Sequence, residues 1–278
     1  MITFTVPQSL RRAIRSHQRK AYSALFSASS ETLKAVAATT RFVGGDLPGF
    51  FGVLHTWGRQ LTYHPHIHYV VPGGAVSKSD ATWHPSPVSF FAPVRVMSAI
   101  FKAKLRDEFT RIDLLKYVDP DVWQHDFIVN CQAAGACQQS VRYLAPYVFK
   151  VAISNSRIIK VERGKVFFRY QKPRSNRWRT MALEIMEFMR RYLQHVLPTG
   201  FMKVRHYGFM NSASSVELEK VKSLIELATA LRERCQRLLS TTTCTHGVPL
   251  VGATWRFAAG YIRSSPGLLS MDDAELLG

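Results

Sequence analysis

The sequence predicts an α+β protein built around an antiparallel sheet. Stretches that are β-rich or alternate between apolar and polar residues interleave with stretches whose apolar residues recur at helical spacing. Neighbouring strands are joined by short turns as well as by helices, which favours antiparallel pairing over a doubly wound parallel sheet. The 278 residues, 46% of them hydrophobic, are enough to bury a substantial core.

The expected elements run through most of the chain. Ile2–Val6 is predicted as a strand that Pro7 ends, and Ser9 as the N-cap of a long helix reaching about Ala38. The further predicted strands are Phe50–Trp57, His66–Val71, Val166–Tyr170 and Met202–Phe209, and the further helices are Pro93–Ile112, Gln138–Lys150, Met181–Leu197 and Ser215–Leu239. We expect a core over residues 1–212 with a basic hairpin insertion, and a C-terminal helix with a poorly structured tail over residues 213–278.

The charge balance indicates a polyanionic partner. Lys and Arg number 37 against 19 Asp and Glu, a formal charge of +18, which favours nucleic acid first and an anionic membrane surface second. No apolar run approaches the roughly 18–20 residues that span a bilayer, and the N-terminus does not resemble a secretory signal. We therefore expect a cytoplasmic protein with reduced cysteines and no membrane association. A zinc site from Cys235, Cys244 and His246 stays open as an alternative.

The segment His64–His68, HPHIH, is the first candidate site. Residues two apart in a strand project from the same face, so His66 and His68 would stand roughly 6–7 Å apart and could hold one divalent ion. The third ligand is expected from His55 on the preceding strand, with Gln60 in the intervening loop as the alternative. A pair of surface histidines without a metal would give the same pattern.

Tyr143 and Tyr147 are the second candidate site. Four residues make a little more than one helical turn, so both phenols would share one face with Cβ atoms roughly 6 Å apart. Tyrosine, with a pKa of about 10, is a weak nucleophile that becomes useful when a metal polarises the phosphate it attacks. Two core aromatics would have the same spacing, and Pro146 interrupts helical hydrogen bonding unless it lies in the first turn.

Residues 142–179 contain eleven basic side chains and a single acid, Glu162. Aromatic residues are interleaved with them, and a basic groove with aromatic platforms suits single-stranded nucleic acid, where each stacked base contributes about 1–3 kcal/mol. A solvated basic hairpin is the alternative. The residues expected to contact DNA are Lys150, Arg157, Lys160, Arg169, Lys172, Arg174, Arg177 and Arg179.

Three motifs, in this order and spacing, resemble the two-tyrosine rolling-circle transposases of bacterial insertion sequences, within the HUH single-strand endonuclease superfamily. They are HTWGRQLTYHPHIHYVVPGG, YLAPYVFKVAISNSRI and RYLQHVLPTGFMKVRHYGF, and the similarity extends over most of the chain. The resemblance implies a ferredoxin-like or RRM-like antiparallel sheet with packed helices and a C-terminal helical extension. It further implies that His66 and His68 bind Mg²⁺ or Mn²⁺, and that Tyr143 and Tyr147 are the nucleophiles.

The activity that the resemblance implies is cleavage and rejoining of single-stranded DNA, at transposon ends and targets, through a 5′-phosphotyrosine. The location implied is the nucleoid of a prokaryotic cytoplasm, and a homo-oligomer is compatible with it. Members of the family usually begin with a cysteine-rich zinc-binding domain, and this sequence begins at the first strand of the core. The alternative function is a catalytically inactive or truncated remnant that only binds nucleic acid. A small-molecule metallohydrolase would explain neither the tyrosine pair nor the charge.

Overall fold

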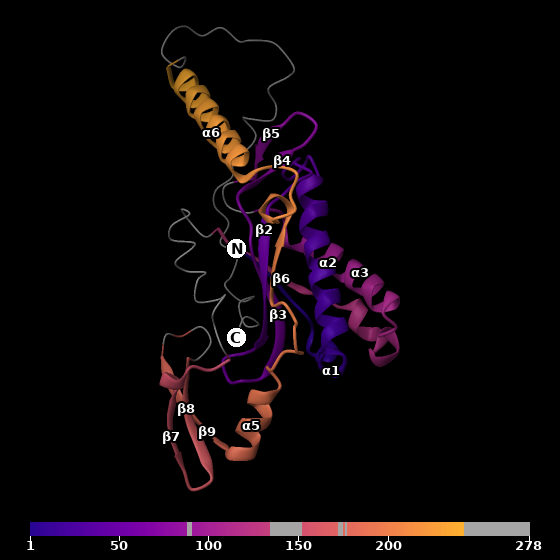
Figure 1. Cartoon of the computed structure of the whole chain (residues 1–278), viewed down its shortest axis with the longest axis vertical. Coiled ribbons are helices and arrows are strands. Elements are labelled where there is room, and N and C mark those ends of the chain that lie inside the picture. The colour runs from indigo at the N-terminus through magenta and orange to yellow at the C-terminus, as the bar shows by residue number, and fades with distance from the viewer. Residues whose placement is uncertain (88–90, 134–151, 172–174, 176, 242–278) are drawn as a thin grey trace.

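A five-stranded antiparallel sheet forms the centre of the molecule, with the strand order β10-β2-β3-β1-β6 (Figure 1). A computed structural model describes residues 1–87, 91–133, 152–171, 175 and 177–241 of the chain. The strands of the central sheet are β1 (Ile2–Thr5), β2 (Phe50–Trp57), β3 (Tyr63–Val70), β6 (Ile128–Cys131) and β10 (Val204–Tyr207). The predicted α+β class with antiparallel pairing is confirmed.

Four of these strands and two helices follow the βαββαβ pattern of a ferredoxin-like fold. Helix α2 (Gln18–Ala38) lies between β1 and β2 in the chain, and α3 (Val94–Arg111) lies between β3 and β6. Strands β2 and β3 form a hairpin, β1 lies between β3 and β6, and β10 adds a fifth strand beside β2. The ferredoxin-like sheet implied by the family resemblance is therefore the fold observed.

The helices cover one face of this sheet, where Figure 1 shows α2 and α3 lying side by side. Phe4 of β1 packs against Phe101 of α3 with ring centroids 4.9 Å apart, and the Tyr69 hydroxyl lies 2.7 Å from that of Ser29 on α2. All four residues are buried. Because successive side chains of a strand point to opposite faces, the histidines next to Tyr69 in β3 lie on the face away from these helices.

The N-terminal helical region begins differently from the prediction. A 3-10 turn, η1 (Gln8–Leu10), leads into the short helix α1 (Arg11–Ser16), and His17 separates α1 from α2. Ser9 lies inside the 3-10 turn, Pro7 occupies the N-cap position, and no side chain caps that end. The predicted Ser9 cap and the single long helix are therefore wrong, because His17 has φ −128° and ψ 43°, outside the helical region.

A second, three-stranded sheet follows later in the chain, where a basic hairpin was expected. It consists of β7 (Ile158–Glu162), β8 (Lys165–Gln171) and β9 (Trp178–Glu184), and α5 (Ile185–Leu193) packs against it. Figure 1 shows these elements together at the end of the molecule opposite α6. We call β7–β9 and α5 the basic unit.

The prediction of one helix over Met181–Leu197 is wrong in its first part. Residues 181–184 belong to β9, which pairs with β8 over its whole length. Met181 and Leu183 alternate with exposed neighbours and pack against the buried cluster of Phe168. This two-residue period indicates a strand. The apolar stripe of α5 begins directly after it, so the two segments were predicted together as one helix.

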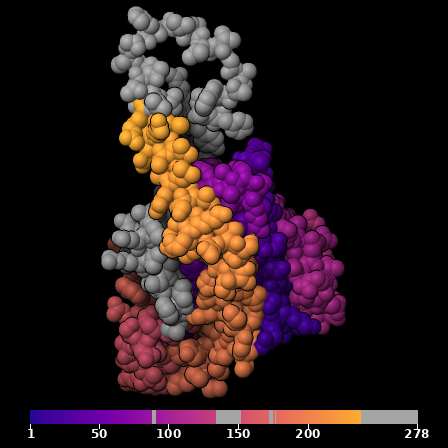
Figure 2. All heavy atoms as spheres, turned by 45° about the horizontal axis from the view of Figure 1, so that its top comes forward, coloured from indigo at the N-terminus to yellow at the C-terminus, as the bar shows by residue number. Residues whose placement is uncertain are grey.

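A small hairpin and the last helix pack together at the other end of the sheet. The hairpin is β4 (Gly74–Ser77) with β5 (Thr82–Pro85), and the helix is α6 (Leu218–Thr241). Val221, in the first turn of α6, is 1% exposed and packs with Val76 and Phe209. Leu227 and Leu231, further along, are 58% and 54% exposed. Among the described residues, the buried contacts of α6 therefore lie in its first part, and Figure 2 shows the helix projecting from the body.

The remaining described elements are short 3-10 helices: η2 (Leu115–Tyr117), η3 (Pro120–Gln124), η4 (Asn155–Arg157) and η5 (Gly208–Met210). Within the described ranges, none of the helices combines the length and apolarity needed to cross a membrane.

Candidate metal centre

The β2–β3 hairpin brings three histidines together on the face of the central sheet away from α2 and α3. His55 of β2 lies directly opposite His66 of β3, and His68 lies two residues further along β3. The ring nitrogens that could serve as ligands all lie within 4.8 Å of one another. His55 is buried, whereas the other two are half-buried. Three imidazoles this close can converge on one metal ion after small side-chain rotations.

Gln60, the other candidate for the third ligand, lies in the turn that joins the two strands. The pair formed by Trp57 and Tyr63 separates this turn from the pair formed by His55 and His66. The backbone carbonyl of Gln60 accepts a hydrogen bond from a basic side chain of α5. The strand register therefore favours His55 over Gln60.

Hydrogen bonds to neighbouring groups orient two of the three rings. Nδ1 of His66 lies 2.7 Å from the carbonyl oxygen of His64. A carbonyl can only accept, so Nδ1 carries a proton, and in the neutral ring Nε2 is then the nitrogen free to bind a metal. Nδ1 of His68 lies 2.9 Å from the hydroxyl of Thr3 on β1. Such contacts at the second ring nitrogen are typical of histidines that ligate metals.

Thr5 of β1 lies directly opposite His66, on the side away from His55. It is 1% exposed, and within the described part of the chain its hydroxyl has no hydrogen-bond partner. A buried hydroxyl without a partner costs about 1–3 kcal/mol, and such groups usually contact a water or a ligand. This polar atom, beside three converging imidazoles, fits a site that a hydrated divalent ion completes.

His64 continues the row of histidines, with its ring centroid 5.1 Å from that of His66. Burial, with smaller contributions from His66 and Arg11, lowers the pKa of His64 to about 3. His64 is therefore neutral at physiological pH and adds no positive charge that would oppose a cation nearby.

The turn of the histidine hairpin is held by residues from the basic unit and its edges. Three successive backbone carbonyls of the turn each accept a hydrogen bond, from a different basic side chain. The pairs are Arg59 with Arg157 at 2.9 Å, Gln60 with Arg191 at 3.3 Å, and Leu61 with His195 at 3.2 Å. We call these three bonds the turn clamp. They fix the end of the hairpin to the basic unit.

Leu61 also anchors this turn through its side chain. The side chain is fully buried among residues of the basic unit that include Phe168 and Phe188. Its backbone has φ 59°, in the left-handed region that residues with a Cβ adopt at a cost. Burial of the leucine side chain, which contributes roughly 1.5–3 kcal/mol, offsets that cost.

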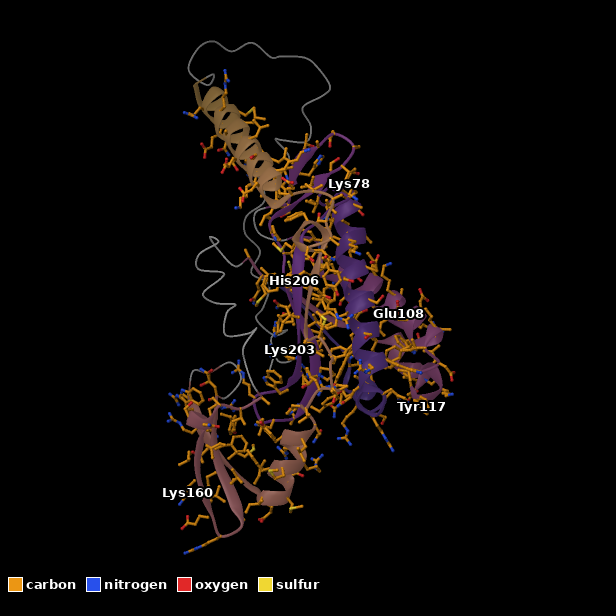
Figure 3. The ribbon with its side chains drawn as sticks, in the orientation of Figure 1. Lys78, Glu108, Tyr117, Lys160, Lys203 and His206 are labelled. Atoms are coloured by element: carbon orange, nitrogen blue, oxygen red, sulfur yellow. The ribbon has the colours of Figure 1, made fainter. Side chains whose placement is uncertain are left out.

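The structure describes five of the residues that we predicted to contact DNA. Arg157, Lys160, Arg169, Arg177 and Arg179 lie in the basic unit or at its edge, and Figure 3 shows Lys160 on the second sheet. The guanidinium of Arg157 donates to the carbonyls of Arg169 and Arg59, and its burial lowers its pKa. Arg157 thus holds the unit together, whereas the other four are exposed. Lys150, Lys172 and Arg174 lie outside the described residues.

The predicted nucleophiles Tyr143 and Tyr147, with the helix predicted over Gln138–Lys150, also lie outside the described residues. Both flanks of that segment are described. Before it, β6 pairs with β1, the strand that carries Thr3 and Thr5. After it, Ala152 is buried in the same cluster as Leu61.

A family model described as "Putative transposase" (Y2_Tnp) matches residues 49–217, more than half of the chain and all of the histidine hairpin. The chain belongs to this transposase family. The family predicted from the three motifs is thereby confirmed.

Two curated relatives of this transposase-family chain are transposases by name. The "Putative transposase y4qJ" of Sinorhizobium fredii (strain NBRC 101917 / NGR234) is 35% identical over 232 residues, 76% of this chain. The "Transposase for insertion sequence element IS801" of Pseudomonas savastanoi pv. phaseolicola is 25% identical over 243 residues, 82% of this chain. The matched part covers 58% of the length of each relative. No solved structure matches the chain.

Sequence reasoning missed the residues of this transposase-family chain that support the histidines. Thr3 and Thr5 alternate with the core residues Ile2 and Phe4 in β1. That alternation places both threonines on the face opposite the core, and it was visible in the sequence. Their contact with β3, by contrast, depends on a pairing of strands more than sixty residues apart.

Proposed function

We propose that this chain is the catalytic part of a transposase that cleaves and rejoins single-stranded DNA through a 5′-phosphotyrosine intermediate, as in rolling-circle transposition. The observation that carries the proposal is the convergence of His55, His66 and His68 next to a basic sheet. Membership of a transposase family and the two relatives support it.

The three histidines would hold Mg²⁺ or Mn²⁺. When bound, such an ion polarises the scissile phosphate and offsets the negative charge that develops during attack. Thr3 and the carbonyl of His64 keep two of the rings in the orientation that presents Nε2. Imidazole is a softer ligand than a carboxylate, so the set is expected to bind Mn²⁺ more tightly than Mg²⁺.

Tyr143 and Tyr147 are assigned as the nucleophiles. The phenol oxygen of one attacks the phosphorus, and the bond to the 3′-oxygen breaks as the tyrosine–phosphorus bond forms. The proton lost by the phenol is balanced by the proton that the released 3′-hydroxyl gains. The tyrosine ester conserves the bond energy, so rejoining needs no nucleotide cofactor. A second tyrosine allows another strand to be cut while the first stays linked.

The exposed bases of the basic unit supply the binding charge in this proposal. Lys160, Arg169, Arg177 and Arg179 belong to or adjoin its strands, and Lys150, Lys172 and Arg174 add to the same stretch of sequence. Phosphate contacts of this kind position a nucleic acid without reading its sequence.

The test is a denaturing-gel assay with labelled single-stranded oligonucleotides from the ends and flanks of the element that encodes the chain. The proteins are the parent, Tyr143→Phe, Tyr147→Phe, the double variant His66→Ala/His68→Ala, and His125→Ala as a control at an exposed histidine away from the hairpin. We expect a covalent band with Mn²⁺ or Mg²⁺ that EDTA and the double variant abolish and that the control keeps. Retained DNA binding without an adduct in any metal, on substrates that a full-length relative cleaves, would establish the binding remnant instead.

A further inference from the structure

The second sheet has one face in a hydrophobic core and one in solvent. Phe168 of β8 is fully buried and packs against Phe188 of α5 with ring centroids 5.8 Å apart. Its neighbours Phe167 and Arg169 therefore point to the opposite, outer face. The register between β8 and β9 puts Trp178 on that outer face as well, because it pairs with Gln171.

Charge is distributed unevenly along this sheet. Near the β7–β8 turn, two ion pairs offset most of the positive charge. They join Lys160 to Glu162 and Lys165 to Glu184. At the opposite end lie Arg169, Arg177 and Arg179, and no carboxylate of the described residues pairs with any of them. A polyanion therefore meets uncompensated charge at the Trp178 end of the sheet.

Trp178 is the exposed aromatic ring at that end. It is 52% exposed, and the guanidinium carbon of Arg169 lies 5.3 Å from the centre of its ring. Phe167, near the other end of the same face, is less exposed and has the ammonium of Lys160 at 5.1 Å from its ring centre. An exposed indole with one guanidinium group at its ring and others close in the sequence can stack on a base while the cations contact the adjoining phosphates.

We propose that Trp178 stacks on an unpaired base of single-stranded DNA and that Arg169 and Arg177 hold the phosphates on either side of that base. The inference rests on the proposed function for its DNA substrate, and it adds the contact that selects single strands. In a duplex both faces of each base are covered by neighbouring base pairs, so Trp178 gains nothing there and only the charges act. The outer face of β7–β9 is thus a single-strand sensor.

The experiment measures binding of the full chain to a fluorescent oligothymidine and to a duplex of mixed sequence, in EDTA so that no cleavage occurs. The variants are Trp178→Ala, Trp178→Phe and, as a matched control, Met186→Ala at an exposed apolar residue of the same unit. Trp178→Ala is expected to weaken single-strand binding about 5- to 150-fold, equivalent to ~1–3 kcal/mol. Its duplex binding and its salt dependence should stay as in the parent.

Trp178→Phe should recover most of the single-strand affinity because phenylalanine also presents a π-face, and Met186→Ala should behave as the parent. An equal loss on single strands and duplex, or no loss at all with Trp178→Ala, would overturn the inference. The adduct assay is separate from these measurements. If the parent forms adducts and Trp178→Ala binds single strands as the parent does, the proposed function is supported and this inference is overturned. If Trp178→Ala loses only single-strand binding but the parent forms no adduct, this inference is supported and the proposed function is overturned.

Discussion

At the scale of single residues, Thr3 contacts Nδ1 of His68, the ring nitrogen that would not bind the metal. Its hydroxyl lies 2.9 Å from Nδ1, which leaves Nε2 as the nitrogen that His68 can offer to a metal. Removal of partners of this kind from ligand histidines typically costs 10- to 100-fold in metal affinity or activity.

Thr3→Val is therefore expected to lower the affinity for Mn²⁺ by roughly 10- to 100-fold, measured by isothermal titration calorimetry. Thr3→Ser keeps the hydroxyl and should restore most of the affinity. Thr32→Val is the control, because Thr32 is a buried threonine of α2, on the other face of the sheet from the histidines. Equal affinities for parent and Thr3→Val would mean that packing alone orients His68.

At the scale of elements, His195 joins the end of α5 to the histidine hairpin. Its Nε2 donates to the carbonyl of Leu61, and its Nδ1 accepts from the hydroxyl of Thr56, the neighbour of His55 in β2. Burial lowers the pKa of His195 below its ordinary value of 6.5. The hydrogen bonds of the ring to backbone groups of Leu61 and Thr56 favour the protonated form, but burial outweighs them, so the folded chain favours the neutral ring.

Stability is expected to fall as the pH drops below about 6.5, because the unfolded chain then binds a proton at this residue that the folded chain does not. The contribution of His195 to stability is fully present when the pH is above the pKa of the unfolded chain. It decreases as the pH falls toward the lower pKa of the folded chain. Melting temperatures of the metal-free protein between pH 8 and pH 5 measure it. His195→Gln should give a shallower pH dependence, and an unchanged slope would contradict the assignment.

Elements with a strong periodic signal could be predicted, and those without one could not. β2 was predicted at its observed bounds, and α3 within one residue at each end. The short strands β4, β5 and β6 have only four residues each, too few for a period to stand out. The histidine trio was predictable because a two-residue period and a hairpin register bring it together. The clamp was not, because it joins segments about 100 to 130 residues apart.

At the scale of the whole molecule, packing is concentrated in the central sheet, in the basic unit and at the base of α6. The base of α6 buries Val221 against Val76 and Phe209, whereas its distal part is exposed. The expected boundary near residue 212 stays a prediction, and this packing allows a test of it.

A chain ended after Glu226 is expected to melt within a few degrees of the parent, because it keeps the buried part of α6. A chain ended after Ala213 should melt several degrees lower, because Val76 and Phe209 lose their cover. Circular dichroism melts of both, beside a chain ended after Thr241, provide the comparison. If the two shorter chains melt together, α6 contributes no packing to the core.

The turn clamp has a consequence for where a strand would be cut. The hairpin that carries His55 and His66 is bonded at its turn to the unit that carries Trp178. Two points on a bound strand, the base on Trp178 and the phosphate at the histidines, would then be separated by a fixed length of protein. Under the proposed function, the chain would act as a molecular ruler, setting the number of nucleotides from a held base to the cleaved bond regardless of the sequence between them.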